Sequence, residues 1–333
     1  MGHAKPLHGS PGRTQGLARG LHPRAVMNEL PSQSALNTAG EASMQIANLF
    51  YWMTIGGSLI WLLVVGLIVY AIFSTAQHDA KLTRLLVIGG GAAFPTVVLT
   101  VLLTYGLAMM PELQRPAPDG SQVVEVAGVR WWWRINYRLA DGTKVATANE
   151  IHLPVDEAVE FKLSSEDVIH SFWIPSLGGK TDMIPGRETR LKLRPTKVGV
   201  YRGVCAEFCG AAHAQMSFDV VVESREDFDR WLAGLSQPAI NGSQVGEDVF
   251  LQRGCSACHS IRGGRANGLV GPDLTHFGSR RTIGAAVLAN TPENLRRWIT
   301  STHIVKPGVE MPSFAAIPAD ELDALIEYLG SLR

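Results

Sequence analysis

The chain has 333 residues, enough for two or three domains, and its 30 Lys and Arg residues balance its 30 Asp and Glu residues. A chain without a basic excess lacks the electrostatic footprint of a nucleic-acid-binding protein, so we expect no nucleic-acid partner. The apolar residues are concentrated in two long runs in the first third, whereas the rest has the composition of a soluble protein.

Residues 1–40 are rich in Gly, Pro, Ser and Ala and contain no apolar core of a signal peptide. We expect a mobile N-terminal tail here, with a start at Met27 as the alternative for the segment 1–26.

The two apolar runs, Leu49–Phe73 and Leu85–Met110, contain no charged residue. Each exceeds the roughly 20 residues that a helix needs to cross a bilayer. The sequence therefore predicts a transmembrane helical hairpin over residues 41–114, and two buried core helices are the alternative.

The charges that flank these runs predict their orientation. Lys81 and Arg84 lie in the short connection, whereas the segment Leu30–Asn48 has no Lys or Arg. By the positive-inside rule, the connection is cytoplasmic and both termini lie outside. We expect a multi-pass protein of the bacterial inner membrane, with the later domains on the periplasmic side.

Residues 115–224 show short apolar or alternating runs such as Val123–Val126 and Phe218–Val222, separated by turn signals such as Asp141-Gly142. This pattern predicts an all-β sandwich or barrel. Residues 225–243 are expected to form a linker that begins with a short helix. Residues 244–333 change character and end on an amphipathic helical pattern, so we expect a separate helical domain there.

The segment from Cys205 to Met216 places several metal-binding side chains within twelve residues: Cys205, Glu207, Cys209, His213 and Met216. Thiolates, imidazole and thioether form a soft donor set that favours copper. Zinc would be satisfied by two Cys and two His, but Met216 would then have no role. A Cys205–Cys209 disulfide would leave the histidine and the methionine without a role as well. His170 is the candidate for a second histidine.

The pattern Cys-x-Glu-x-Cys followed by His and Met, with the upstream run His-Ser-Phe-Trp-Ile-Pro at residues 170–175, closely resembles cytochrome c oxidase subunit II. The resemblance implies a Greek-key cupredoxin barrel that carries a dinuclear copper centre, CuA. In that family, two cysteines bridge the coppers, two histidines bind one copper each, and a methionine and a backbone carbonyl are weak axial ligands. The corresponding residues here are Cys205, Cys209, His170, His213, Met216 and Glu207.

Two further features follow from the same resemblance. Trp131 corresponds to the tryptophan through which electrons enter, within the aromatic cluster Trp131-Trp132-Trp133. The Glu207 side chain and Asp182 correspond to positions around a magnesium ion at the boundary with subunit I, and carboxylates suit that ion. His152 lies in no ligand motif, and we expect a surface or strand histidine.

Cys255-Ser256-Ala257-Cys258-His259 fits the C-x-x-C-H motif of covalent haem c attachment, with His259 as the proximal iron ligand. A thioredoxin-like redox pair is the rival, but no βαβ pattern surrounds it. Met311, in a Pro/Gly-rich loop, is the candidate for the second axial ligand, because Met with His suits electron transfer. His303 and His276 are its rivals.

This last segment resembles a small, all-α class I cytochrome c. The resemblance implies that Gly246 and Phe250 on the first helix meet Tyr328 on the last. It also implies that the Pro272 carbonyl accepts the ring N–H of His259, which would orient that ligand.

Together the resemblances imply subunit II of a haem–copper oxidase with a fused cytochrome c domain. Electrons would pass from an external donor, such as a cytochrome, through haem c and CuA to the haem of subunit I. There oxygen would be reduced to water with proton pumping. Subunit I, subunit III and membrane lipid are the implied partners, since the two apolar runs contain no histidine for an oxygen-reducing site.

Two alternatives share the copper motif. A CuA-bearing nitrous-oxide reductase would need a histidine-rich catalytic domain, which the sequence does not show. A membrane-anchored copper carrier would have no use for a haem domain.

Overall fold

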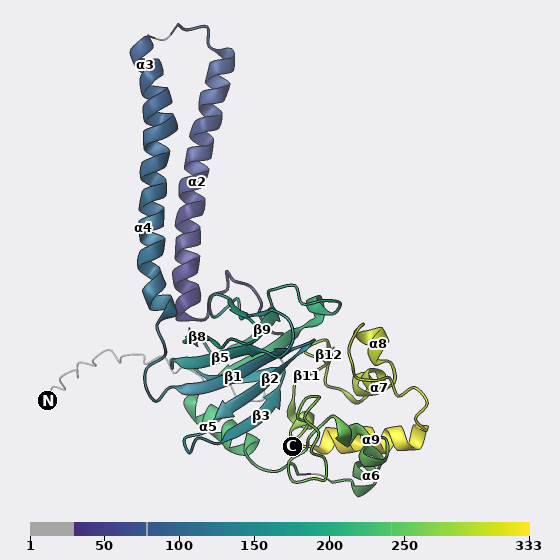
Figure 1. Cartoon of the computed structure of the whole chain (residues 1–333). Coiled ribbons are helices and arrows are strands. Elements are labelled where there is room, and N and C mark those ends of the chain that lie inside the picture. Colours follow the sequence, from purple (N-terminus) through teal and green to yellow (C-terminus); the bar gives the residue numbers. More distant parts are fainter. Residues whose placement is uncertain (1–29, 78, 241) are drawn as a thin grey trace, which may run out of the picture.

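The computed structural model describes residues 30–77, 79–240 and 242–333, and arranges them in three parts (Figure 1). A pair of long helices extends from a β-sandwich, and a group of shorter helices lies beside the sandwich. The predicted combination of a helical hairpin, an all-β domain and a separate helical domain is therefore confirmed.

The segment before the first long helix differs from the expected mobile tail. Residues 1–29 lie outside the described residues, but residues 30–40 pack on the sandwich. The Ser32 amide donates to the Val200 carbonyl over 3.0 Å, and Gly40 forms a β-bridge with Pro195. An added Cβ at Gly40 would lie 2.2 Å from the Leu177 carbonyl oxygen, so this close approach requires glycine. Residues 30–40 are therefore held against the sandwich instead of forming a mobile tail, and α2 begins directly after them at Glu41.

The helical hairpin consists of α2 (Glu41–Phe73) and a second helix that combines α3 (Ala80–Arg84), a wider π-helical turn (Leu85–Ala93) and α4 (Phe94–Gln114). Both helices are long and apolar enough to cross a membrane, with mean hydropathies of 2.4 and 2.2. They also extend beyond the apolar runs, and Glu112 at the end of α4 forms a 2.8 Å ion pair with Lys192 of the sandwich.

The sandwich contains two five-stranded sheets, of order β3-β2-β1-β5-β8 and β4-β10-β9-β6-β7. Their strands are β1 (Gln122–Val129), β2 (Trp132–Arg138), β3 (Lys144–Ala148), β4 (Glu150–Pro154), β5 (Val159–Ser165), β6 (His170–Trp173), β7 (Thr181–Met183), β8 (Thr189–Leu193), β9 (Gly199–Cys205) and β10 (Ser217–Glu223). Aromatic rings fill the space between the sheets: Phe172 stacks on Phe218 at a centroid distance of 4.9 Å, and Trp133 meets Phe218 edge-on at 5.1 Å. All three rings are fully buried, and aromatic side chains of this size bury a large apolar area that stabilises the sandwich.

Helix α5 (Arg225–Leu235) belongs structurally to the sandwich, although the sequence placed it in a linker. Its Phe228 is fully buried in the sandwich core, and its Trp231 stacks on His152 at 3.9 Å. His152 lies in β4 and is buried between Glu150 and Glu223, at 3.3 and 2.8 Å from the nearest carboxylate oxygens. Burial lowers its pKa, but the hydrogen bonds to the two carboxylates outweigh that effect and raise the pKa above its ordinary value.

The third part comprises α6 (Gln244–Gln252), α7 (Pro292–Thr300), α8 (Thr302–Val305) and α9 (Ala319–Ser331). An added Cβ at Gly246 would lie 2.3 Å from the Ala324 carbonyl oxygen and 2.4 Å from the Tyr328 Cβ. Glycine therefore lets α6 approach α9, and the rings of Phe250 and Tyr328 meet at 6.0 Å, as the resemblance to cytochrome c implied.

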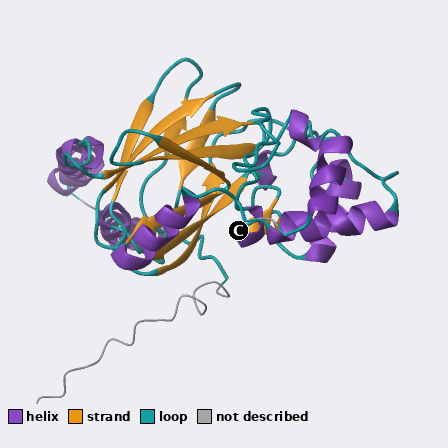
Figure 2. Cartoon of the chain, turned by 90° about the horizontal axis from the view of Figure 1, so that it is seen from below, coloured by secondary structure: helices purple, strands orange, loops and turns teal. Residues whose placement is uncertain are grey.

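A short hairpin, β11 (Thr282–Ile283) and β12 (Leu288–Ala289), was not predicted. It brings the helical part against the sandwich (Figure 2). The Thr282 hydroxyl donates to the buried Asp219 carboxylate over 3.0 Å, and Arg202 donates to the Ala286 carbonyl over 2.9 Å. Such hydrogen bonds between buried groups fix the relative position of the two parts.

Candidate copper and haem sites

The copper candidates meet where β6 begins and β9 ends. These strands pair with Phe172 opposite Cys205, which brings His170, the first residue of β6, beside Cys205, the last residue of β9. The loop after β9 turns back, and the Cys205 amide donates to the Met216 carbonyl over 2.9 Å. Local pairing and loop closure thus collect residues that lie up to 46 positions apart in the chain, from His170 to Met216.

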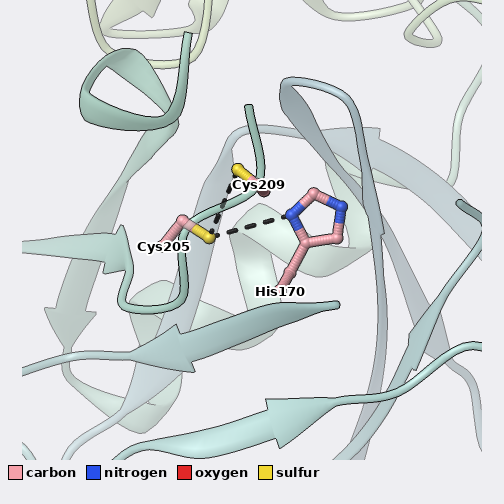
Figure 3. Close-up of side chains that lie close together, drawn as sticks. All are labelled: His170, Cys205 and Cys209. Carbon is pink, nitrogen blue, oxygen red and sulfur yellow. Dashed lines mark hydrogen bonds between the residues drawn. The ribbon is translucent and has the colours of Figure 1, made fainter. Parts of the chain in front are cut away.

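The sulfur and nitrogen atoms of this cluster face one another (Figure 3). The two cysteine Sγ atoms are 3.8 Å apart, and the His170 Nδ1 is 3.7 Å from the Cys205 Sγ. On the other side, the Cys209 Sγ lies 3.5 Å from the His213 Nδ1 and 3.8 Å from the Met216 Sδ. The Glu207 carbonyl oxygen is 3.2 Å from the Cys205 Sγ. All six expected donors are therefore brought together.

The chemistry of this donor set fits copper. Both cysteines are free and buried, so the structure holds them as thiols and not as a disulfide. The hydrogen bond that Cys205 shares with Cys209 lowers the pKa of Cys205 well below its usual range, which favours the thiolate that binds metals. Met216 is 1% exposed, so its thioether is directed into the cluster, as a soft metal would require.

Two residues that sequence reasoning missed orient the His170 ring. The Nε2 of His170 lies 2.8 Å from the Asp167 carboxylate, which leaves the Nδ1 lone pair directed toward Cys205. Gly128 on β1 leaves space for the ring, since an added Cβ would lie 2.6 Å from the His170 Cδ2. The position of Asp167, three residues before His170, is the sequence feature that could have indicated this contact.

Glu207 and Asp182, the two carboxylates expected near magnesium, both lie close to the side chain of Lys180. The Lys180 ammonium lies 3.8 Å from the Glu207 carboxylate and 3.6 Å from the Asp182 carboxylate, and all three side chains are about half exposed. The two carboxylates therefore share one exposed ammonium, and the magnesium ion at the boundary with subunit I stays a prediction.

The haem candidates line a cleft between the helical part and the sandwich, with an empty volume of about 1240 Å³ that includes open solvent. Cys255, Cys258 and His259 line it, and so does Met311. The floor is apolar, with Leu274, Phe277 and Phe314 among its residues. A large, flat, apolar group bound covalently at one edge fits a cleft of this kind.

The His259 ring is oriented for ligation. Its Nδ1–H donates to the Pro272 carbonyl over 2.7 Å, so Nε2 carries the free lone pair. Burial lowers the pKa of His259 and favours the neutral, metal-binding form. An added Cβ at Gly271 would lie 2.7 Å from the ring, so glycine is required beside it.

The rival histidines lie elsewhere. His303 is exposed and is not part of the cleft lining, and the Nε2 of His276 lies 3.1 Å from the Gln237 carbonyl. Among the three candidates for the second axial ligand, Met311 is therefore the one that lines the cleft.

Trp131 belongs to both sites. Its ring lines the haem cleft, and its indole N–H donates to the carbonyl of Cys209 over 2.9 Å. Trp132 also lines the cleft, whereas Trp133 is fully buried in the sandwich core. One indole therefore separates the haem cleft from the copper loop.

Comparison with known proteins agrees with this geometry. Residues 136–225 match the family described as cytochrome C oxidase subunit II, periplasmic domain, and residues 243–333 match cytochrome c. Cytochrome c oxidase subunit 2 of Alkalihalophilus pseudofirmus is 35% identical over 244 residues, which cover 71% of this chain and 69% of that protein. The chain belongs to the cytochrome c oxidase subunit 2 family.

Other relatives of this subunit 2 family are similar. The Bacillus subtilis protein of the same name is 33% identical over 254 residues, covering 71% of this chain and 70% of that protein. The crystal structure of the periplasmic domain of subunit II from Bradyrhizobium japonicum is 28% identical and covers 36% of this chain and 96% of that chain, with a TM-score of 0.34. Membership of the family makes the chain a subunit of a cytochrome c oxidase, an oxidoreductase, and implies subunit I as a partner.

The assignment of the axial position is testable with two variants. We expect Met311→Ala to lower the potential of haem c by on the order of 0.1 V, because loss of the thioether removes a ligand that favours ferrous iron. His303→Ala is the matched control and should leave the potential unchanged, because that side chain lies outside the cleft. Redox titration of the haem band measures both. A shift in the His303 variant alone would assign the ligand to His303.

Proposed function

We propose that this chain accepts electrons on a covalent haem c and passes them through a CuA centre to the haem of subunit I. Cys255 and Cys258 would hold the haem, with His259 and Met311 as axial ligands. The copper ligands would be His170, Cys205, Glu207 through its carbonyl, Cys209, His213 and Met216. When bound, haem and copper supply reversible one-electron carriers.

The observation that supports this relay most is the position of Trp131. Trp131 lines the haem cleft, and its indole N–H donates to the carbonyl of Cys209, one of the proposed copper ligands. Trp131 is 8% exposed, so the indole itself is largely shielded from water. A buried, rigid path of this kind suits electron transfer between two fixed centres.

The chain's own residues also prepare each site. The Asp167 carboxylate and the Pro272 carbonyl each fix one histidine tautomer, so both imidazoles present a free lone pair without rearrangement. Preorganised ligands keep the geometry similar in both oxidation states, which limits the reorganisation that accompanies each transfer. A copper carrier would need an open site, whereas four of the six copper candidates are buried, namely His170, Cys205, Cys209 and Met216, and this observation favours the relay.

Oxygen reduction and proton pumping belong to subunit I in this proposal. An external donor, such as a cytochrome, would reduce the haem domain, and subunit III would complete the complex. The copper and haem domains would lie on the periplasmic side of a bacterial inner membrane, because Lys81 and Arg84 favour a cytoplasmic position for the connection between α2 and α4.

The copper centre is tested on residues 115–235, a fragment that includes α5 because Phe228 is buried in the sandwich core. After copper addition, we expect a seven-line electron paramagnetic resonance pattern, because one unpaired electron is shared by two equivalent nuclei. Cys205→Ser should abolish the pattern, since a hydroxyl bridges copper weakly, whereas Met216→Leu should retain it. A four-line spectrum with one copper per chain would contradict CuA and indicate a mononuclear carrier.

The orientation is tested by cysteine labelling of intact cells. A cysteine introduced at Gln77 should resist a membrane-impermeant thiol reagent, because that residue lies in the connection between the helices. Asp119→Cys is the control and should react, since it lies on the exposed turn before β1. Labelling is compared with the unaltered chain to account for the native cysteines. Reaction at Gln77→Cys but not at Asp119→Cys would reverse the topology.

A further inference from the structure

Lys306 is a buried lysine at the junction of the two sites. It follows α8, and its side chain is 1% exposed. The Nζ donates to three backbone carbonyls, those of Trp131 at 2.7 Å, Gln215 at 2.8 Å and Gly284 at 2.8 Å. These carbonyls come from three segments: the turn between β1 and β2, the copper loop, and the hairpin of the haem domain.

Burying an ammonium group costs several kcal/mol unless hydrogen bonds replace its water shell. An ammonium has three N–H donors, and here each has a carbonyl acceptor. Burial lowers the pKa of Lys306 to about 7, whereas the three carbonyls favour the protonated form, since a neutral amine would direct its lone pair at one of them. The Lys306 ammonium thus connects three chain segments through its three hydrogen bonds.

Gln215 completes the junction from the copper side. Its side-chain amide donates to the Val305 carbonyl over 2.9 Å, while its own carbonyl accepts from Lys306. Residues 305–306 and Gln215 therefore exchange two hydrogen bonds. Gln215 lies between the proposed copper ligands His213 and Met216, so this exchange holds the copper loop directly.

The same segment continues to the haem cleft. Gly308 has a φ of +85°, and an added Cβ would lie 3.1 Å from the Trp131 Cη2 and 3.2 Å from the Ala211 Cβ. The backbone at Gly308 thus passes against the indole, in a conformation that favours glycine. Three residues later, Met311 lines the cleft. The loop from Lys306 to Met311 therefore spans the distance from the copper loop to the proposed haem ligand.

We propose that Lys306 and Gln215 are positioning residues for electron transfer between haem c and CuA. They fix the loop that ends in Met311 on the copper loop, with Trp131 held between them. This inference rests on the proposed function, and it assigns the geometry of the transfer to two residues that lie outside both proposed ligand sets.

The test uses the purified oxidase complex with three variants. Lys306→Met keeps the apolar stem and removes the ammonium, and Gln215→Ala removes the reciprocal bond. Lys197→Met is the matched control, because Lys197 is an exposed lysine that donates to one carbonyl, that of Thr38. The haem spectrum, the haem potential and the copper resonance signal are recorded first, and all should match those of the unaltered complex.

The transfer rate is then measured after flash photoreduction of the haem. In this step one electron leaves the reduced haem and enters the oxidised copper centre, without a proton. We expect Lys306→Met to slow the step about tenfold or more, because transfer and reaction rates are sensitive to small displacements. Gln215→Ala should slow it by a smaller factor, and Lys197→Met should leave the rate unchanged.

A second readout does not depend on electron transfer. In the full chain before copper is added, we expect faster amide hydrogen exchange at residues 206–216 and 305–311 in Lys306→Met than in the unaltered chain. The Lys197→Met control should exchange at the original rate in both segments.

The outcomes separate this inference from the function on which it rests. Unchanged transfer rates in both junction variants would overturn the inference and leave the proposed relay intact. Absence of haem-to-copper transfer in the unaltered complex would instead overturn the relay. Loss of the haem or copper signals in Lys306→Met would assign Lys306 to site assembly and overturn its positioning role. If Lys306→Met does not fold, an unchanged rate in Gln215→Ala overturns the inference.

Discussion

The hydrogen bond from the Trp131 indole to the Cys209 carbonyl joins the two candidate sites, and much of the structure supports it. The sandwich supplies the turn that carries Trp131 and the strands that bring His170 to Cys205. The haem domain supplies the opposite wall, because Gly308 lies against the indole and Met311 lines the cleft beyond it. A displacement of either domain would open the space between them to water.

Buried polar groups hold the domains in this arrangement. The Arg281 amide donates to the Glu150 carboxylate over 2.8 Å, and Thr282 donates to Asp219. With Lys306, these contacts place charged groups in a region that water does not reach, where each unpaired group would be costly. Because such contacts depend on direction, they specify one docked orientation, whereas apolar contact alone would permit sliding. The interface therefore holds the two domains in one relative orientation, unlike a flexible linkage between independent domains.

From the sequence, we could predict those features whose residues lie close together in short motifs. Cys205 to Met216 and Cys255 to His259 keep most of the proposed ligands within a few residues, so spacing, donor chemistry and the family resemblance could indicate both candidate sites. Lys306 and Gln215 could not be found in this way, because their partners are backbone carbonyls, which leave no trace in the residue types. The packing of α5 on the sandwich and of residues 30–40 beside it was missed for a related reason. Polar or Gly-rich composition indicates a linker or tail, but tertiary contacts at Phe228 and Gly40 override that local tendency.

The central claim is that the haem cleft and the copper loop are held at one fixed separation. Pulsed electron paramagnetic resonance on the oxidised full chain, loaded with both cofactors, measures the dipolar effect of the ferric haem on the copper signal. The account predicts a strong effect that corresponds to a single narrow distance, and loss of the effect in a chain carrying Cys255→Ser and Cys258→Ser, which cannot attach the haem. A broad distribution of distances, or no difference between the two chains, would contradict it.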